Sequence, residues 1–306
     1  MKKYLVFLLI LSIFLSGCSG LNLSTRSNDR SNDGPLTGSP NGIKINFLEQ
    51  PPKIISGNKL QIPIELVNNA ACDAVGKLCV SDSAPDSVGG LSQPLCQDFT
   101  LDGAEKISGK QVIPKGKFYF ETSPYNLENS NFKERDYTLF ATVTYRCGVV
   151  AEPTFCVAAY SQGSSCKSSE VISGSNLGAA VAPITVTKVE KFTNPASGGA
   201  TVLTTITLSK MSKGYIINEL DATEQSNTIQ GEPISIYVDI DGNPMECSGL
   251  DSSGKLYWKT DDQSKEINCK STLNFADTLD AHLKIGIDFF YKTTESKAIK
   301  VTNPLI

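Results

Sequence analysis

The segment Ile234-Ser-Ile-Tyr-Val-Asp-Ile240 alternates apolar and polar residues without interruption. Such alternation is typical of a β-strand with one face in a core, because successive side chains of a strand point to opposite faces. Asp241-Gly242-Asn243 follows at once, and Asp-Gly and Gly-Asn pairs favour the positive backbone φ angles of a tight turn. The segment therefore predicts a half-buried strand that ends in a hairpin.

The same alternation recurs along the chain from Ile43 onward. Turn residues separate the runs, and no stretch longer than a turn or two has helical spacing. Short strands, frequent turns and a lack of helices predict an all-β fold of the sandwich type. The apolar positions of the other main runs are Ile43, Ile45 and Phe47; Ile62, Ile64 and Leu66; Leu139, Ala141, Val143 and Tyr145; Val202, Ile206 and Leu208; and Leu283, Ile285, Ile287, Phe289 and Tyr291.

The strand pattern repeats in two halves of the chain. The run that starts at Ile43 matches the run that starts at Ile184, and the run from Leu139 matches the run from Leu283 at nearly the same offset. Matching offsets indicate a duplicated domain, although two unrelated all-β domains could match by coincidence. We predict two tandem β-sandwich domains, at residues 43–160 and 183–306, joined by a Ser-, Gly- and Ala-rich linker at 161–182.

Three segments of this pattern carry a family resemblance. They are the turn Gln50-Pro-Pro-Lys-Ile-Ile-Ser-Gly57, the end of a strand at Val67-Asn68-Asn69, and the late strand Tyr137–Cys147. The halves resemble immunoglobulin-like domains of the CARDB and S-layer-associated type, over most of the range 43–303. The resemblance implies immunoglobulin-like sandwiches that bind other molecules at a cell surface. The only tryptophan, Trp258, lies outside the first half, so the Cys…Trp…Cys pattern of antibody domains is missing.

The first eighteen residues have the pattern of an export signal. Lys2-Lys3 precedes the apolar run Tyr4–Leu15, which is shorter than the roughly twenty residues that a membrane-spanning helix needs. The run ends in Leu15-Ser16-Gly17-Cys18, which resembles the lipobox of prokaryotic lipoproteins, archaeal ones included. The resemblance implies cleavage before Cys18 and a diacylglyceryl group on its thiol. An ordinary signal peptide with a chance cysteine is the alternative.

We therefore predict a signal peptide at residues 1–17 and, at 18–42, the lipidated cysteine with a disordered tether. Residues 19–42 consist mostly of Ser, Asn, Asp, Gly, Thr, Pro and Arg. Such a composition buries too little apolar surface to offset the entropy lost on ordering. As a flexible coil the tether would span roughly 25–30 Å and would hold the folded part away from the lipid headgroups.

The cysteine count supports an exported protein. The chain has nine cysteines, and eight remain to pair if Cys18 carries a lipid. Abundant cysteine beside an export signal predicts disulfides in an oxidising compartment. Zinc is the alternative, but C-x-x-C pairs are missing and His282 is the only histidine. The eight predicted disulfide cysteines are Cys72, Cys79, Cys96, Cys147, Cys156, Cys166, Cys247 and Cys269.

Sequence position suggests how these cysteines pair. Cys247 and Cys269 are the only two in the second half, so they pair if that domain is self-contained. A hairpin over residues 148–155 would place Cys147 and Cys156 directly opposite each other, close enough to bridge. For the remaining four we expect Cys79 with Cys96 and Cys72 with Cys166.

The turn after Ile240 is the best candidate for a metal site. Calcium prefers several oxygen ligands on a tight loop, and Asp239, Asp241, Asn243 and Glu246 carry such oxygens. The pattern departs from an EF-hand loop because glycine follows the second aspartate directly. A plain hairpin turn is the alternative. Calcium at this turn is the only cofactor that the sequence suggests.

No set of residues indicates catalysis, and we predict that the protein is not an enzyme. His282 is opposite in phase to Leu283 and Ile285, which predicts a solvent-facing side chain. The sequence contains neither a Gly-rich phosphate loop nor a Gly-x-Ser-x-Gly motif, although a hydrolase that uses paired carboxylates stays an alternative. Without Lys2 and Lys3 the chain has 26 basic and 32 acidic residues, a balance that disfavours nucleic acid as a partner.

The sequence thus favours an extracytoplasmic, membrane-anchored protein at the cell surface. We expect a non-enzymatic binding or structural role in the cell envelope, with an envelope protein or a polysaccharide as the partner. The alternative is a solute- or carbohydrate-binding lipoprotein that serves a transporter or a hydrolase complex. A pocket with an aromatic lining would favour ligand binding, whereas a flat edge strand would favour assembly.

Overall fold

The described part of the chain consists of β-strands and turns with two short 3-10 helices. The prediction of an all-β fold is therefore confirmed. Within this part, no helix is long and apolar enough to cross a membrane. The predicted signal peptide, Cys18 and most of the tether lie outside the described residues. The computed structural model describes residues 38–49, 53–108, 110–127, 132–160, 165–196, 198–220 and 231–303.

The strands follow the alternation of the sequence closely. In the last strand, the side chains of Leu283, Ile285 and Ile287 are buried. His282, which directly precedes Leu283, is exposed, as its phase in the alternation predicts. The strands are β1 (Ile43–Phe47), β2 (Ile54–Ile55), β3 (Gln61–Asn68), β4 (Ala74–Asp82), β5 (Leu95–Leu101), β6 (Glu105–Ile107), β7 (Lys110–Val112), β8 (Lys115–Glu121), β9 (Glu134–Ala151), β10 (Thr154–Ala158), β11 (Ser169–Ser173), β12 (Ile184–Ala196), β13 (Gly199–Lys210), β14 (Tyr215–Ile217), β15 (Glu232–Ile240), β16 (Asn243–Pro244), β17 (Glu246–Ser248), β18 (Lys255–Trp258), β19 (Ser264–Asn274) and β20 (Thr278–Thr302), and the 3-10 helices are η1 (Asp86–Val88) and η2 (Gly174–Leu177).

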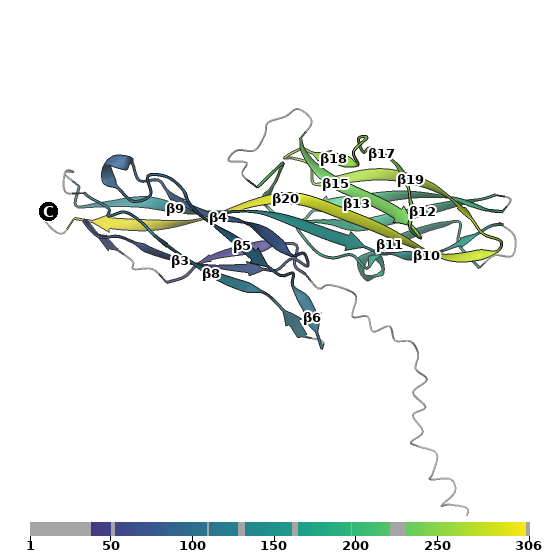
Figure 1. The fold of residues 1–306 in the computed structure, drawn as a ribbon, viewed down its shortest axis with the longest axis horizontal. Coiled ribbons are helices and arrows are strands. Elements are labelled where there is room, and N and C mark those ends of the chain that lie inside the picture. Colours follow the sequence, from purple (N-terminus) through teal and green to yellow (C-terminus); the bar gives the residue numbers. More distant parts are fainter. Residues whose placement is uncertain are drawn as a thin grey trace, which may run out of the picture. The chain divides into compact units, whose positions relative to one another are not determined.

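A long antiparallel ladder joins β20 to β9 and β10 (Figure 1). Ile285 pairs with Ala151 and His282 pairs with Thr154, so one register runs through both pairings. The interruption between β9 and β10 falls at Pro153, which has no N–H to donate. Its carbonyl still accepts a hydrogen bond from the Leu283 amide at 3.0 Å. β9 and β10 therefore continue each other along one side of β20.

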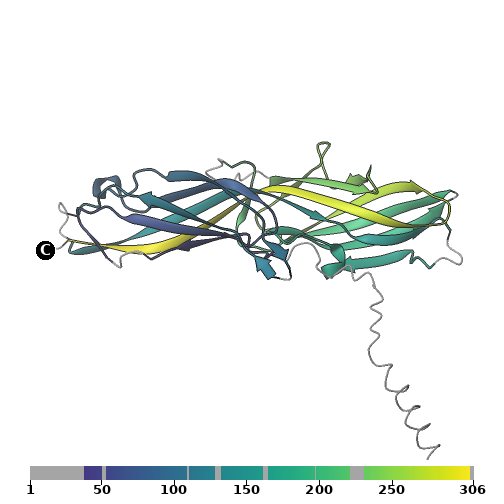
Figure 2. The same cartoon turned by 60° about the horizontal axis from the view of Figure 1, so that its bottom comes forward.

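The strands of the described residues form four sheets. The ladder belongs to a ten-stranded sheet with the order β16-β15-β20-β9-β4-β5, to which β2, β10, β14 and β18 add at the sides. A three-stranded sheet has the order β1-β3-β8, and a five-stranded sheet has the order β11-β12-β13-β19-β17. β6 and β7 form a separate two-stranded hairpin, which projects from the other strands in Figures 1 and 2.

The long ladder carries both halves of the sequence. Residues 34–306 form one compact unit, and most of their buried apolar side chains form one cluster, to which β20 contributes from Ala281 to Val301. The segment 161–182, predicted to be a linker, contributes β11, which pairs with β12 at the edge of the five-stranded sheet. The division into two tandem immunoglobulin-like domains stays a prediction, and the shared strand shows how the halves are joined.

All eight predicted disulfide cysteines are paired. The pairs Cys79–Cys96 and Cys247–Cys269 are those predicted, and in both pairs the two cysteines face each other across neighbouring strands. The four disulfides indicate that the protein folds in an oxidising, extracytoplasmic environment.

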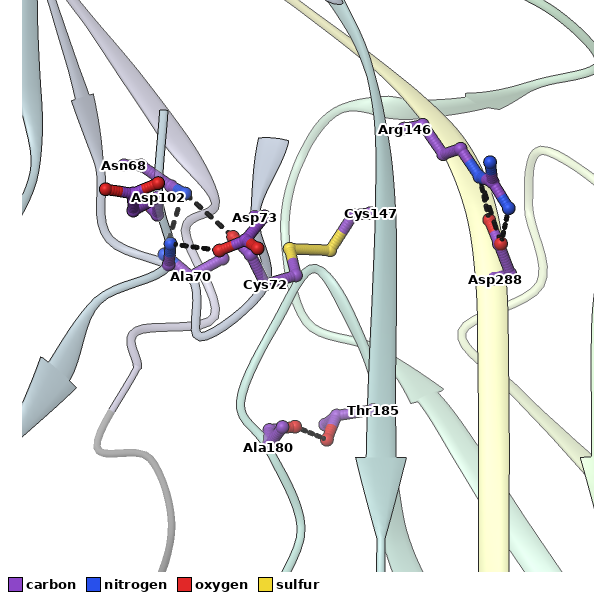
Figure 3. The surroundings of a disulfide bond; sticks show 11 residues. Asn68, Ala70, Cys72, Asp73, Asp102, Arg146, Cys147, Ala180, Thr185 and Asp288 are labelled. Atoms are coloured by element: carbon purple, nitrogen blue, oxygen red, sulfur yellow. Dashed lines mark hydrogen bonds and ion pairs between the residues drawn. A yellow bond between two sulfur atoms is a disulfide. The ribbon is translucent and has the colours of Figure 1, made fainter. Parts of the chain in front are cut away.

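The other two predicted pairings are wrong. The structure joins Cys72 to Cys147 and Cys156 to Cys166 (Figure 3 shows the first of these bonds). The prediction required a hairpin between Cys147 and Cys156, but these cysteines lie on β9 and β10, which run in the same direction along β20. Nine residues of extended chain span about 30 Å, so no disulfide can join them.

Three buried tyrosines make the fold sensitive to alkali. Burial raises the pKa of Tyr125, Tyr145 and Tyr291 above the ordinary value of 10.0, that of Tyr291 to about 12. In the unfolded chain these phenols ionise near pH 10, so the unfolded state loses protons first and stability falls as the pH rises further. We expect a loss of about 4 kcal/mol at pH 11, about 1.4 kcal/mol for each tyrosine. Urea unfolding at pH 9 and pH 11 measures this loss, and equal midpoints would contradict it.

Candidate functional site

The outer face of the five-stranded sheet carries a hollow of about 690 Å³. Its lining comes from β11, β12, β13, β17 and β19, so it lies across one sheet face rather than between converging loops. The volume is within the range of about 300–1,000 Å³ that is usual for ligand sites. We call this feature the sheet hollow.

Two apolar side chains lie exposed at the centre of the sheet hollow. Phe192 of β12 is 50% exposed and Leu203 of β13 is 39% exposed, and the two residues pair directly across the strands. The same row continues to Ser169 on β11 and to Lys270 on β19. A large aromatic ring on a rigid sheet face exposes apolar surface that water solvates poorly, so the row offers a contact surface for a ligand.

The next row supplies polar groups beside this apolar pair. Glu190, Thr205 and Asn268 face one another across β12, β13 and β19. The Thr205 hydroxyl donates to Asn268 Oδ1 at 2.7 Å, which leaves the Asn268 amide N–H groups directed away from this bond. Glu190 pairs with Lys188 at 2.8 Å, and this hydrogen bond and charge raise the pKa of Lys188. Hydroxyl, amide and carboxylate groups thus border the aromatic ring.

The underside of the same strand is held by a buried lysine. Lys191, next to Phe192, is 1% exposed and points to the opposite face. Its ammonium group donates to the carbonyls of Cys156 at 2.9 Å and Lys167 at 2.6 Å, and Glu170 lies at 3.7 Å. Burial lowers the pKa of Lys191, and the charge of Glu170 opposes this effect. The lysine ties β12 to the segment around the Cys156–Cys166 disulfide, on the face of the sheet opposite the hollow.

The acidic turn after β15 is a hairpin. Asp241 and Gly242 have φ angles of 50° and 78°, and β15 pairs with β16 across them. Asp239 Oδ1 accepts from the Gly242 amide at 2.9 Å, and Asp241 Oδ1 accepts from the His282 amide at 3.0 Å. The Asn243 side-chain amide donates to the carbonyls of residues 240 and 241. The hairpin alternative accounts for these three residues.

A calcium site at this turn stays a prediction. Within the described ranges, no group of three or more His, Cys, Asp or Glu side chains is arranged to hold a metal ion. Glu246 lies on β17, in the five-stranded sheet, where it pairs with Lys270 beside the sheet hollow. The structure therefore places Glu246 in the lining of the sheet hollow.

Four carboxyl groups of the described residues have a clearly shifted pKa. The pKa values of all four of these groups are lowered, whereas a general acid needs a raised pKa. A hydrogen bond from a lysine side chain is the main cause for Glu121, Glu134 and Asp262, and a hydrogen bond from the backbone N–H of Lys255 is the main cause for Asp251. His282 makes a 3.1 Å contact with the Thr154 hydroxyl at an exposed position.

No protein-family model matches the chain, and no curated protein sequence is significantly similar to it. The resemblance to lipobox lipoproteins and to CARDB-type domains therefore stays a prediction from the sequence.

The sheet hollow is not predicted by the sequence pattern described above. Phe192 and Leu203 are apolar residues at solvent-facing positions of their strands. Apolar residues at such positions are the signal that could have revealed the hollow. A β-bulge between Val186 and Lys188 hides the signal, because it reverses the alternation within β12.

Proposed function

We propose that this protein is a lipid-anchored protein of the cell surface that binds a polysaccharide of the cell envelope in the sheet hollow. The observation that carries the proposal is the exposed pair Phe192 and Leu203, surrounded by hydroxyl, amide and carboxylate side chains. A sugar ring has an apolar face of C–H groups and a rim of hydroxyls, so it matches an aromatic ring with polar neighbours. The role is binding rather than catalysis.

The charges around the sheet hollow support an uncharged ligand. Glu190 and Glu246 are acidic, Lys270 is basic, and each of the three lies beside a residue of opposite charge. A site for a strongly anionic polymer would need a cluster of basic side chains. The hollow also follows one sheet face, which suits an extended chain better than a small solute that must be enclosed. This geometry supports a polymer ligand over the transport-linked alternative.

The anchor and the disulfides support the location. The signal pattern with Cys18 predicts lipidation, and the disulfides place folding in an oxidising environment. A protein held at the outer face of a membrane meets envelope polysaccharides directly.

The proposal predicts that Phe192→Ala weakens binding to envelope polysaccharide by about tenfold or more, because the change removes the stacking surface. Stability should change by less than about 0.5 kcal/mol, since the ring is half exposed. Co-sedimentation with insoluble envelope polysaccharide, before and after protease treatment of that material, measures the binding.

The matched control is Tyr237→Ala, which removes another aromatic ring of similar exposure (51%) from the ten-stranded sheet. It should bind as the parent protein does. Equal losses in both variants, or binding that disappears when the polysaccharide is treated with protease, would count against the proposed ligand. The second result would indicate an envelope protein as the partner.

A further inference from the structure

The hairpin of β6 and β7 exposes two apolar side chains. Within the described residues these strands pair only with each other, and all their residues are exposed. Ile107 is 51% and Val112 is 42% exposed. Ile107 pairs with Lys110 and Val112 pairs with Glu105, so the two apolar residues are diagonal neighbours on one face of the hairpin.

The hairpin is oriented by a rigid corner at residues 68–73. An isolated two-stranded hairpin is marginally stable in water, so its direction depends on what holds its base. The Ala104 amide donates to the Ala70 carbonyl at 2.7 Å, and the buried Asn68 side chain donates to the Asp102 carbonyl at 2.8 Å (Figure 3). The Cys72–Cys147 disulfide fixes the corner to β9.

The N-terminal side of the described chain meets the same corner. The Ser39 amide donates to the Asn69 carbonyl, and a Cβ on Gly38 would lie 2.5 Å from the Ala71 amide nitrogen. If residues 19–37 form the flexible tether that the sequence predicts, they span about 22–26 Å between Cys18 and this corner. The predicted tether therefore enters the described fold beside the base of the hairpin.

The charges of the hairpin suit an anionic surface. Lys110 and Glu105 lie on the same face of the hairpin as the apolar pair, Lys106 lies on the opposite face, and Lys115 begins the next strand; all three lysines are exposed. Glu105 is the one acidic residue of β6 and β7. Apolar side chains beside lysines are the combination that binds the interface of an anionic lipid layer, where each lysine strengthens the attraction.

We propose that the hairpin of β6 and β7 is a second membrane contact, in which Ile107 and Val112 enter the headgroup layer of the membrane that carries the Cys18 lipid. The proposal rests on the lipid anchor of the proposed function. The lysines pair with anionic headgroups, and the contact fixes the orientation of the sheets above the membrane.

The test uses the full lipidated chain reconstituted in vesicles with about a third of anionic lipid. Hydrogen exchange of residues 105–112 is compared with exchange of the same chain in neutral vesicles and in detergent. We expect protection in anionic vesicles that is lost in the variant with Ile107→Ser and Val112→Ser. In Lys106→Gln with Lys110→Gln, the ratio of membrane-bound to unbound hairpin should fall about 25-fold, about fivefold for each lysine. Exchange of β11, whose Val171 is also exposed, serves as the internal control and should not change.

Two further measurements separate this inference from the anchor. Flotation and intact mass report the anchor, whereas exchange at the hairpin reports the contact. A lipidated chain that floats but whose hairpin exchanges equally in all three media overturns the hairpin contact alone. Protection that follows the protein density in the membrane instead of the lipid charge indicates a second copy of the chain and also overturns it. A chain without lipid that does not float overturns both proposals.

Discussion

Ile285→Asp should unfold both halves of the protein together. Ile285 is fully buried in β20, between Val238 of β15 and Ala151 of β9. An unpaired carboxylate at this position should cost more than about 4 kcal/mol, which is most of the stability of an ordinary domain. Because β20 continues into the first half and the core is one cluster, we expect the first half to unfold together with the second.

Two probes report the two halves separately. Trp258 is the only tryptophan and is 2% exposed in the second half, so its fluorescence follows the packing there. The buried Cys72–Cys147 bond lies in the first half, and its reduction by a mild thiol follows the opening of that half. Ile285→Asp should change both signals.

The control is Lys284→Asp, one residue away on the exposed face of β20. It should change stability by less than about 1 kcal/mol, because surface substitutions and exposed ion pairs contribute little. A different outcome for Ile285→Asp would be informative: loss of the Trp258 signal with a protected Cys72–Cys147 bond would mean that the halves fold independently. That result would support the prediction of two tandem domains.

Cys18→Ser should release the protein from the membrane or leave it unprocessed, while the β-sheets stay folded. The predicted signal, Cys18 and most of the predicted tether precede the described residues, so we expect anchoring and folding to depend on separate parts of the chain. Each buried methylene of an acyl chain contributes about 0.8 kcal/mol, so two acyl chains hold a protein firmly at the membrane. A protein without acyl chains has only its surface contacts with the membrane. We expect nearly all of the variant in the soluble fraction after a salt wash that disrupts the lysine contacts.

Fractionation and intact mass of the detergent-extracted parent check this expectation. The parent should carry a diacylglyceryl group on a chain that begins at residue 18. Retained Trp258 fluorescence and thiol-resistant Cys72–Cys147 in the variant would show that the fold is intact. A parent without lipid, or a serine variant that remains with the membrane after the salt wash, would show that the anchor assignment is incorrect.

The sequence was sufficient wherever the cause of a structure lies within a few residues. The alternation in Ile234–Ile240 follows from strand geometry, and the hairpin at Asp241-Gly242 follows from the positive φ angles that these residues tolerate. The exposure of His282 follows from its phase within one unbroken strand. The pairs Cys79–Cys96 and Cys247–Cys269 were also predictable, since each joins cysteines that are near in sequence on neighbouring strands.

The sequence failed where the choice of a partner strand decided the outcome. Cys147 and Cys156 flank a segment that could form a local hairpin, but both β9 and β10 pair with β20, at least 120 residues later in the chain. No local signal distinguishes these two pairings, because the ladder is stabilised by the whole core. The cysteines therefore find other partners.

The candidate site shows the same division. Counting alternately from Ile184 and Val186 places Phe192 in the core and Lys191 in water. The bulge between Val186 and Lys188 inverts this pattern, so Lys191 is buried and Phe192 is exposed. The inversion is tolerated because the carbonyls of Cys156 and Lys167 and the carboxylate of Glu170 come together around the ammonium group and replace its water. The sequence by itself determined which segments are strands, and its prediction of how the chain is exported stays a prediction. Only the tertiary structure decided which face of β12 meets solvent, because that choice depends on polar partners from β10 and β11.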